Sequence, residues 1–157
     1  MVCSPVSGER GWDSHTTNDD LQNVLFGDLF SSLLSLMMML DTLPGEVAPT
    51  LAEETCVIVF SEMGRTPWLN SAGGKDHWPY TSAMLVGSGV NGGAVVGTFG
   101  EQWTGAPIDP ETGTADEGGI TLTCDAFGAT LLAMGDVDWT PYTGEVGPVQ
   151  ALMSETL

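Results

Sequence analysis

Carboxylate and imidazole side chains stand close together at two places in the sequence. The chain has only two histidines, and each has an acidic neighbour: Asp13 precedes His15 by two positions, and Asp76 directly precedes His77. In an extended segment, side chains two residues apart project to the same side. Carboxylate plus imidazole is the ligand set of zinc, manganese or iron, whereas calcium and magnesium prefer oxygen ligands alone. The pattern therefore predicts a divalent-metal site, with zinc, manganese or iron favoured over calcium or magnesium.

Two residues between these motifs extend the predicted site. Glu62 ends an apolar run and could supply a further carboxylate ligand. Arg65 and Lys75 are two of only three basic residues in the chain, and a guanidinium beside a metal can hold a phosphate or sulfate group with two hydrogen bonds. We therefore take Arg65 as the candidate catalytic residue. Two alternatives stay open: the histidines only form hydrogen bonds with loops, or Arg65 only pairs with local carboxylates.

The charge balance limits the classes of partner. With 21 acidic residues among 157 and a net charge of −18, the chain repels phosphate backbones and anionic lipids, so we expect no nucleic-acid partner. The three cysteines are far apart and give neither a zinc-knuckle spacing nor a disulfide framework, and Cys56 and Cys124 are expected as buried free thiols. No signal peptide is evident. The apolar run 33–40 is too short for a bilayer, so no membrane insertion is expected.

Hydrophobic periodicity predicts the elements that position these residues. Leucines at three- and four-residue steps indicate a helix over 19–40, and Thr123 is the expected N-cap of a second helix that ends near Gly135. The uninterrupted apolar run 55–60 is typical of a strand covered on both faces. Further strands are expected at 83–86 and 94–96, with loops at 61–80 and 100–119.

This alternation predicts a single α/β domain over residues 1–157, with helices on both faces of a mostly parallel sheet. The carboxyl ends of parallel strands are where ligands gather. A weak extended segment leads to Asp13, and the predicted strand 55–60 leads to Glu62, so we expect both acids to face one crevice, with the 61–80 loop bringing in His77.

The motifs also carry a family resemblance. Residues 11–15 (Gly-Trp-Asp-Ser-His), 62–67 (Glu-Met-Gly-Arg-Thr-Pro) and 75–79 (Lys-Asp-His-Trp-Pro) resemble an uncharacterised bacterial family of the alkaline phosphatase and sulfatase superfamily, the domain of unknown function numbered fifteen-oh-one. The segments 85–93 and 118–123 also fit this family, so the resemblance covers about residues 8–138.

The resemblance implies an alkaline-phosphatase-like sheet with a metal cluster at its strand ends and a small anionic ester as substrate. By position, Asp13 and His15 match one ligand pair, Glu62 an acid after a central strand, and His77 a late histidine ligand; Asp76 and Arg65 are motif residues without an assigned role. Superfamily enzymes take their nucleophile from a segment far upstream, which this chain lacks. The chain is therefore expected to be the C-terminal part of a metal-dependent phosphoric or sulfuric ester hydrolase, N-terminally truncated.

The alternative is a non-catalytic, exported binding or structural protein that keeps the fold. Full-length relatives carry an export signal, which implies a periplasmic or extracellular location for them and leaves the location of this chain open. The substrate and the oligomeric state are not set by the sequence.

Overall fold

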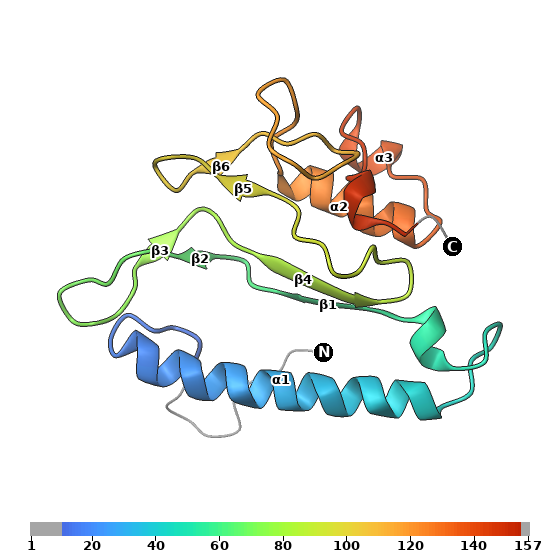
Figure 1. The fold of residues 1–157 in the computed structure, drawn as a ribbon, viewed down its shortest axis with the longest axis horizontal. Coiled ribbons are helices and arrows are strands. Elements are labelled where there is room, and N and C mark those ends of the chain that lie inside the picture. The colour runs from blue at the N-terminus through green and yellow to red at the C-terminus, as the bar shows by residue number, and fades with distance from the viewer. Residues whose placement is uncertain (1–10, 155–157) are drawn as a thin grey trace. The chain divides into compact units, whose positions relative to one another are not determined.

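A computed structural model describes residues 11–154 of the chain. These residues form two compact units, which we describe separately. Unit 1 contains residues up to 51 together with 60–83, and unit 2 contains residues 52–59 together with those from 84 onward. The elements, labelled in Figure 1, are α1 (Asn18–Thr42), a 3-10 turn (Leu51–Glu54), β1 (Cys56–Phe60), β2 (Gly64–Arg65), β3 (His77–Trp78), β4 (Ala83–Gly87), β5 (Thr98–Phe99), β6 (Gly105–Ala106), α2 (Cys124–Met134), α3 (Thr140–Thr143) and a second 3-10 turn (Gln150–Leu152).

The first predicted helix is confirmed as α1, the long blue-to-cyan helix of Figure 1. Its N-cap is Thr17, which has a positive φ of 47° and makes no side-chain capping bond, so the helix begins at Asn18, one residue before the predicted start. The helix ends at Leu43, directly before Pro44, which cannot continue the ladder of helical hydrogen bonds.

Helix α1 is long and apolar by composition. Within its 25 residues, an 18-residue window has a mean hydropathy of 1.6, and 6% of this window is buried. By length and composition alone, the helix could cross a membrane. N-terminal signal sequences and the mostly buried core helices of soluble proteins also have this length and hydropathy, and α1 lies near the N-terminus. Because the run 33–40 is part of this longer helix, its shortness no longer argues against a membrane span.

The prediction of a mostly parallel sheet with helices on both faces is wrong. Residues 11–154 contain three separate two-stranded sheets, β1–β4, β2–β3 and β5–β6, and no extended parallel sheet with helices on both faces. The β2–β3 and β5–β6 pairs are antiparallel. In the β1–β4 pair the Ser88 amide donates to the Thr55 carbonyl at 3.0 Å, which joins the end of β4 to the start of β1, as in an antiparallel pair. The alkaline-phosphatase-like architecture is therefore not found in the described chain.

The strand predictions were correct at two positions and wrong at a third. β1 and β4 confirm the strands expected at 55–60 and 83–86. However, no residue of β1 is fully buried and Phe60 is 64% exposed, so β1 is not covered on both faces as its apolar run suggested. No strand forms at 94–96; the nearest strand is β5, and it pairs with β6 inside the stretch expected to be loop.

The cluster of buried hydrophobic residues lies in unit 2. Ile108, Ala126, Val149 and Ala151 form a small core, with Val96, Ile120 and Leu152 packed against it. Helix α2 presents Ala126 to this core, and its predicted N-cap is confirmed: the Thr123 side chain accepts a hydrogen bond from the Ala126 amide at 3.2 Å.

The cysteine prediction was wrong for both described residues. Cys56 is only partly buried and Cys124 is exposed, although both thiols are free. Burial is still enough to raise the pKa of the Cys56 thiol. Cys3 lies outside the described residues.

Candidate metal centre

Two segments of unit 1 that are far apart in sequence meet at the start of α1. Thr16 forms an antiparallel bridge with Gly73. The Lys75 amide donates to the Ser14 carbonyl at 3.0 Å, and the Asn18 amide donates to the Gly73 carbonyl at 2.9 Å. These backbone bonds place the segment 13–15 beside the segment 75–77, where the loop between β2 and β3 reaches the N-terminal end of α1 (Figure 1).

The β2–β3 pair adds Arg65 to the same place. In this antiparallel register Arg65 lies opposite His77, and Gly64 lies opposite Trp78. Directly opposed residues in an antiparallel pair carry their side chains on the same face. The Thr66 amide continues the pairing by donating to the Asp76 carbonyl at 2.9 Å.

Three of the predicted ligands converge. One ligand atom each from Asp13, His15 and His77 lies within 4.8 Å of the others. The His15 Nε2 atom is 3.2 Å from His77 Nε2 and 3.2 Å from an Asp13 carboxylate oxygen. Two atoms bound at about 2.0–2.2 Å to the same zinc ion are themselves about 3–3.5 Å apart. The spacing and the donor types therefore fit one divalent ion held by two imidazoles and a carboxylate.

Asp76 occupies the other side of the His15 ring. Its carboxylate oxygen lies 3.3 Å from His15 Nδ1, so it faces the nitrogen that points away from Asp13 and His77. Metal-binding histidines commonly donate their second ring N–H to a carboxylate, which fixes the orientation of the ring. Asp76, predicted as a ligand, therefore lies beside His15 Nδ1 and not among the three side chains that converge at Nε2.

Arg65 contacts the same atoms that a metal ion would use. Its Nη2 group donates to the Asp13 carboxylate, its Nη1 group lies 3.3 Å from His15 Nε2, and Nη1 also donates to the Lys75 carbonyl at 3.1 Å. The Arg65 side chain is 18% exposed, against 71% for Asp13. The guanidinium can therefore neutralise Asp13 itself, or move aside for a metal ion and hold an anion beside it.

Local hydrogen bonds set the charge state of both carboxylates. The hydrogen bond from Arg65 lowers the pKa of Asp13, and the nearby His15, Arg65 and His77 charges act in the same direction. Hydrogen bonds from Asn70 and then from His15 lower the pKa of Asp76. Both groups are thus held as carboxylates, the form that binds a metal ion or a histidine N–H.

The remaining predicted residue, Glu62, does not join the cluster. Its carboxylate accepts a hydrogen bond from the neighbouring Ser61 hydroxyl at 3.4 Å, and it is not among the described side chains whose ligand atoms come together. The tryptophans next to the three motifs contact other aromatic rings: Trp68 and Trp78 meet edge to face with centroids 5.2 Å apart, and Trp12 meets Phe26 of α1 at 5.1 Å.

Sequence reasoning missed Asn70, which bonds to both His15 and Asp76. A signal was present: an asparagine shortly before paired glycines, Gly73 and Gly74, is typical of a turn in which the side chain bonds to the backbone. This signal predicts the turn, but it does not reveal which histidine the turn would support.

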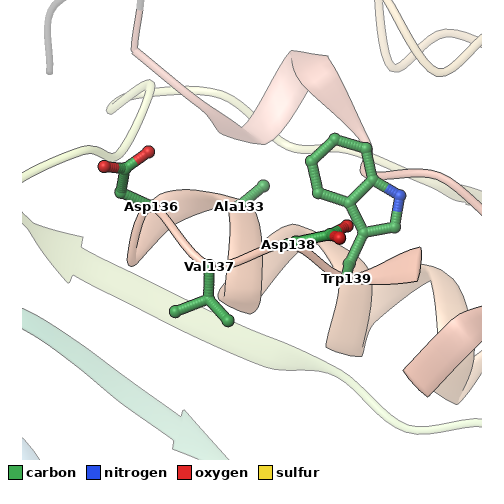
Figure 2. Close-up of a pocket in the computed structure, with 5 residues that line it drawn as sticks. All are labelled: Ala133, Asp136, Val137, Asp138 and Trp139. Carbon is green, nitrogen blue, oxygen red and sulfur yellow. The ribbon is translucent and has the colours of Figure 1, made fainter. Parts of the chain in front are cut away.

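Unit 2 has a separate hollow that contains none of the predicted site residues. It has a volume of about 380 Å³ and is lined by Ala133, Asp136, Val137, Asp138 and Trp139 (Figure 2). The Asp138 carboxylate accepts bonds from the amide and hydroxyl of Thr140, at 3.0 and 2.7 Å, which lowers the pKa of Asp138. The Asp138 carboxylate therefore stabilises the start of α3, and these hydrogen bonds account for its lowered pKa without a bound ligand.

The chain was compared with known protein families, curated proteins and solved structures. The family model described as protein of unknown function (DUF1501) matches residues 6–112, more than half of the chain. This range includes the whole cluster around His15. No curated protein and no solved structure matches the chain.

Proposed function

The chain belongs to the family of proteins of unknown function designated DUF1501, and we propose that it binds a divalent metal ion through Asp13, His15 and His77. The observation that carries the proposal is the position of His15 Nε2, 3.2 Å from both His77 Nε2 and an Asp13 oxygen. Two imidazoles and one carboxylate favour zinc, manganese or iron over magnesium and calcium. All three side chains are exposed, so the ion would remain accessible to a further ligand.

The reaction class that best suits such a centre is hydrolysis of a phosphoric or sulfuric ester, as expected of a phosphatase- or sulfatase-type protein. A bound metal ion would supply Lewis-acid polarisation of the ester and a lowered pKa for bound water. Arg65 supports this assignment because its guanidinium, displaced from Asp13, would lie beside the ion and could hold two oxygens of the anionic group.

We assign no covalent nucleophile among the described residues. Ser14 is the hydroxyl closest in sequence to the ligands, but it is fully buried, donates to Asn18 at 2.8 Å and accepts from Gln22 at 3.0 Å. A metal centre without an attacking side chain lacks covalent catalysis. We therefore expect this chain alone to turn over aryl phosphates and aryl sulfates slowly at most.

A second candidate function is a non-catalytic binding or structural role. The contacts of Arg65 favour it, since its guanidinium satisfies Asp13 and faces His15 without any metal ion. In that case the cluster is a charge network that joins β2 and β3 to the segment before α1.

Zinc titration by calorimetry separates the two candidates. The proposed site requires that the wild-type chain binds one zinc ion. His15→Ala and His77→Ala should each weaken zinc binding by more than about 100-fold, because loss of a residue that only supports a ligand weakens binding by up to about that factor. Glu62→Gln is the matched control and should bind as the wild type does. A wild-type chain that binds no zinc, or manganese or iron in parallel titrations, would leave the charge network as the function of the cluster.

A further inference from the structure

Every donor and acceptor position of the Asn70 side chain forms a hydrogen bond. Its Nδ2 group donates to the His15 carbonyl and to an Asp76 carboxylate oxygen, both at 3.1 Å. Its Oδ1 atom accepts from the amides of Ala72 and Gly74 at 2.9 and 3.0 Å. The opposite orientation of the amide would point N–H groups at two backbone N–H groups. These partners therefore fix which end of the Asn70 amide faces Asp76.

The oxygen of Asp76 that Asn70 contacts is the same oxygen that faces His15. Oδ1 lies 3.1 Å from Asn70 Nδ2 and 3.3 Å from His15 Nδ1. An Asp76 carboxylate can only accept hydrogen bonds. A neutral His15 ring that donates to Asp76 carries its proton on Nδ1, which leaves a lone pair on Nε2. The Arg65 guanidinium, 3.3 Å from Nε2, is also a donor and favours the same tautomer. The Asp13 oxygen 3.2 Å from Nε2 is an acceptor that favours the opposite tautomer, but it already accepts a hydrogen bond from Arg65.

We propose that Asn70 is a positioning residue of the metal centre: by holding the Asp76 carboxylate against His15 Nδ1, it keeps the Nε2 lone pair directed at the ion site. This inference rests on the proposed metal-binding function. Asn70 also anchors the backbone of His15 through its carbonyl, so one side chain sets both the position of the residue and the protonation of its ring. A histidine protonated on Nε2 cannot bind a metal ion through that atom.

The first test needs no metal ion. Long-range proton–nitrogen spectra of the metal-free chain, recorded at about two pH units above the ordinary imidazole pKa of about 6.5, identify which ring nitrogen carries the proton. Only two histidines are present, so a His77→Ala spectrum assigns the His15 signals. Wild-type His15 should show a protonated Nδ1 and an unprotonated Nε2.

Two variants remove different hydrogen bonds between Asn70, Asp76 and His15. Asn70→Asp keeps the shape and the Oδ1 acceptor but removes the donor to Asp76, and Asp76→Ala removes the acceptor for Nδ1. Both should shift His15 toward the Nε2-protonated tautomer and weaken zinc binding about 10- to 100-fold, as is typical of outer-shell partners. Asn91→Asp is the matched control, because Asn91 also donates to a backbone carbonyl, that of Ala151 at 3.0 Å, away from the site.

The outcomes separate this inference from the proposed function. A wild-type His15 protonated on Nε2, or an Asn70→Asp chain whose His15 tautomer matches that of Asn91→Asp, would overturn the positioning role whatever the zinc result. If the wild-type chain binds no zinc but Asn70→Asp shifts the His15 tautomer as expected, the proposed function is overturned. The positioning of His15 by Asn70 then still stands.

Discussion

The Nε2 atoms of His15 and His77 lie 3.2 Å apart although 62 positions separate the two residues. The sequence predicted that Asp13, His15, Glu62 and His77 converge; Asp13, His15 and His77 do so and Glu62 does not, and the route is different from the expected one. Parallel strand ends do not bring the histidines together. Instead, the bridge between Thr16 and Gly73 and the register of Arg65 with His77 bring the two segments together.

Gly74 should be intolerant of any side chain, because the backbone of His15 occupies the space. A Cβ atom at Gly74 would lie 1.9 Å from both the carbonyl carbon and the oxygen of His15. Those atoms belong to the backbone and cannot rotate away. We expect Gly74→Ala to destabilise unit 1 by about 3 kcal/mol or more, at or above the usual range for overpacking, and to abolish zinc binding.

Gly92→Ala provides the control for this change. Nothing lies within 4 Å of the Cβ position at Gly92, so urea unfolding of that variant should match the wild type within about 0.5 kcal/mol. Equal urea midpoints for Gly74→Ala and Gly92→Ala would show that the approach of Gly74 to His15 is not part of the fold in solution.

The stability of unit 1 should fall in acid because of Asp76. The hydrogen bond from Asn70, followed by that from His15, holds the folded-state pKa of Asp76 below the ordinary value of about 3.9. A carboxyl group with a lowered folded-state pKa contributes stability above its unfolded pKa, and this contribution is lost as the pH falls through the folded pKa. We therefore expect Asp76→Asn to reduce the loss of stability below about pH 4.

Urea unfolding at a series of pH values from about 6 downward measures this effect. Asp28→Asn on α1 makes the same charge change and serves as control. The Asp76→Asn and wild-type curves should converge as the pH falls, because protonated Asp76 no longer offers a carboxylate. Curves that stay parallel down to the lowest pH would contradict the lowered pKa of Asp76.

The parts of the fold that the sequence predicted are those with a strong local signal. The leucine spacing of α1, the Thr123 cap of α2 and the apolar runs of β1 and β4 all correspond to observed elements. The meeting of Asp13, His15 and His77 was also predictable, because the only two histidines stand beside acids in the sequence.

The parts of the fold that the sequence did not predict depend on contacts that leave no periodic pattern of hydrophobic residues in the sequence. Strands β2 and β3 have two residues each, too few to show alternation, so the loop 61–80 gave no sign of the pairing that brings Arg65 to His77. The run 55–60 suggested a strand inside a parallel sheet, yet β1 pairs only with β4 among the described strands. Ile108 is fully buried in a stretch rich in Gly, Pro and Thr, where composition indicated a surface loop.

Thr130 should be important for the stability of unit 2 through its hydroxyl group. It is fully buried, donates to the Ala126 carbonyl at 2.7 Å and accepts from the Val149 amide at 2.9 Å. Thr130→Val keeps the shape but leaves the Val149 N–H without its acceptor, which should cost about 1–3 kcal/mol. Thermal unfolding measures this loss, with Thr104→Val at an exposed position as control. Equal stability of the two variants would mean that water or a backbone shift replaces the hydroxyl.

Replacing Arg65 should affect metal binding and anion binding in opposite directions. The Arg65 guanidinium donates to Asp13 and lies 3.3 Å from His15 Nε2, so it competes with a metal ion for both atoms. Because Asp13 is largely exposed, water screens the ion pair, so little binding energy is lost when the pair is broken. Arg65→Met keeps most of the apolar stem and removes the charge. We therefore expect it to tighten zinc binding by up to about fivefold.

The same variant should lose affinity for inorganic phosphate or sulfate in the zinc-loaded chain, because the bidentate donor beside the ion is gone. Calorimetry with zinc first and phosphate second measures both steps on one sample. Lys75→Met removes one positive charge from the same loop without touching Asp13 or His15 through its side chain, so it controls for net charge alone. Weaker zinc binding in Arg65→Met than in Lys75→Met would mean that the guanidinium organises the ligands instead of competing for them. Unchanged phosphate binding in the zinc-loaded Arg65→Met chain would remove Arg65 from the proposed ester site.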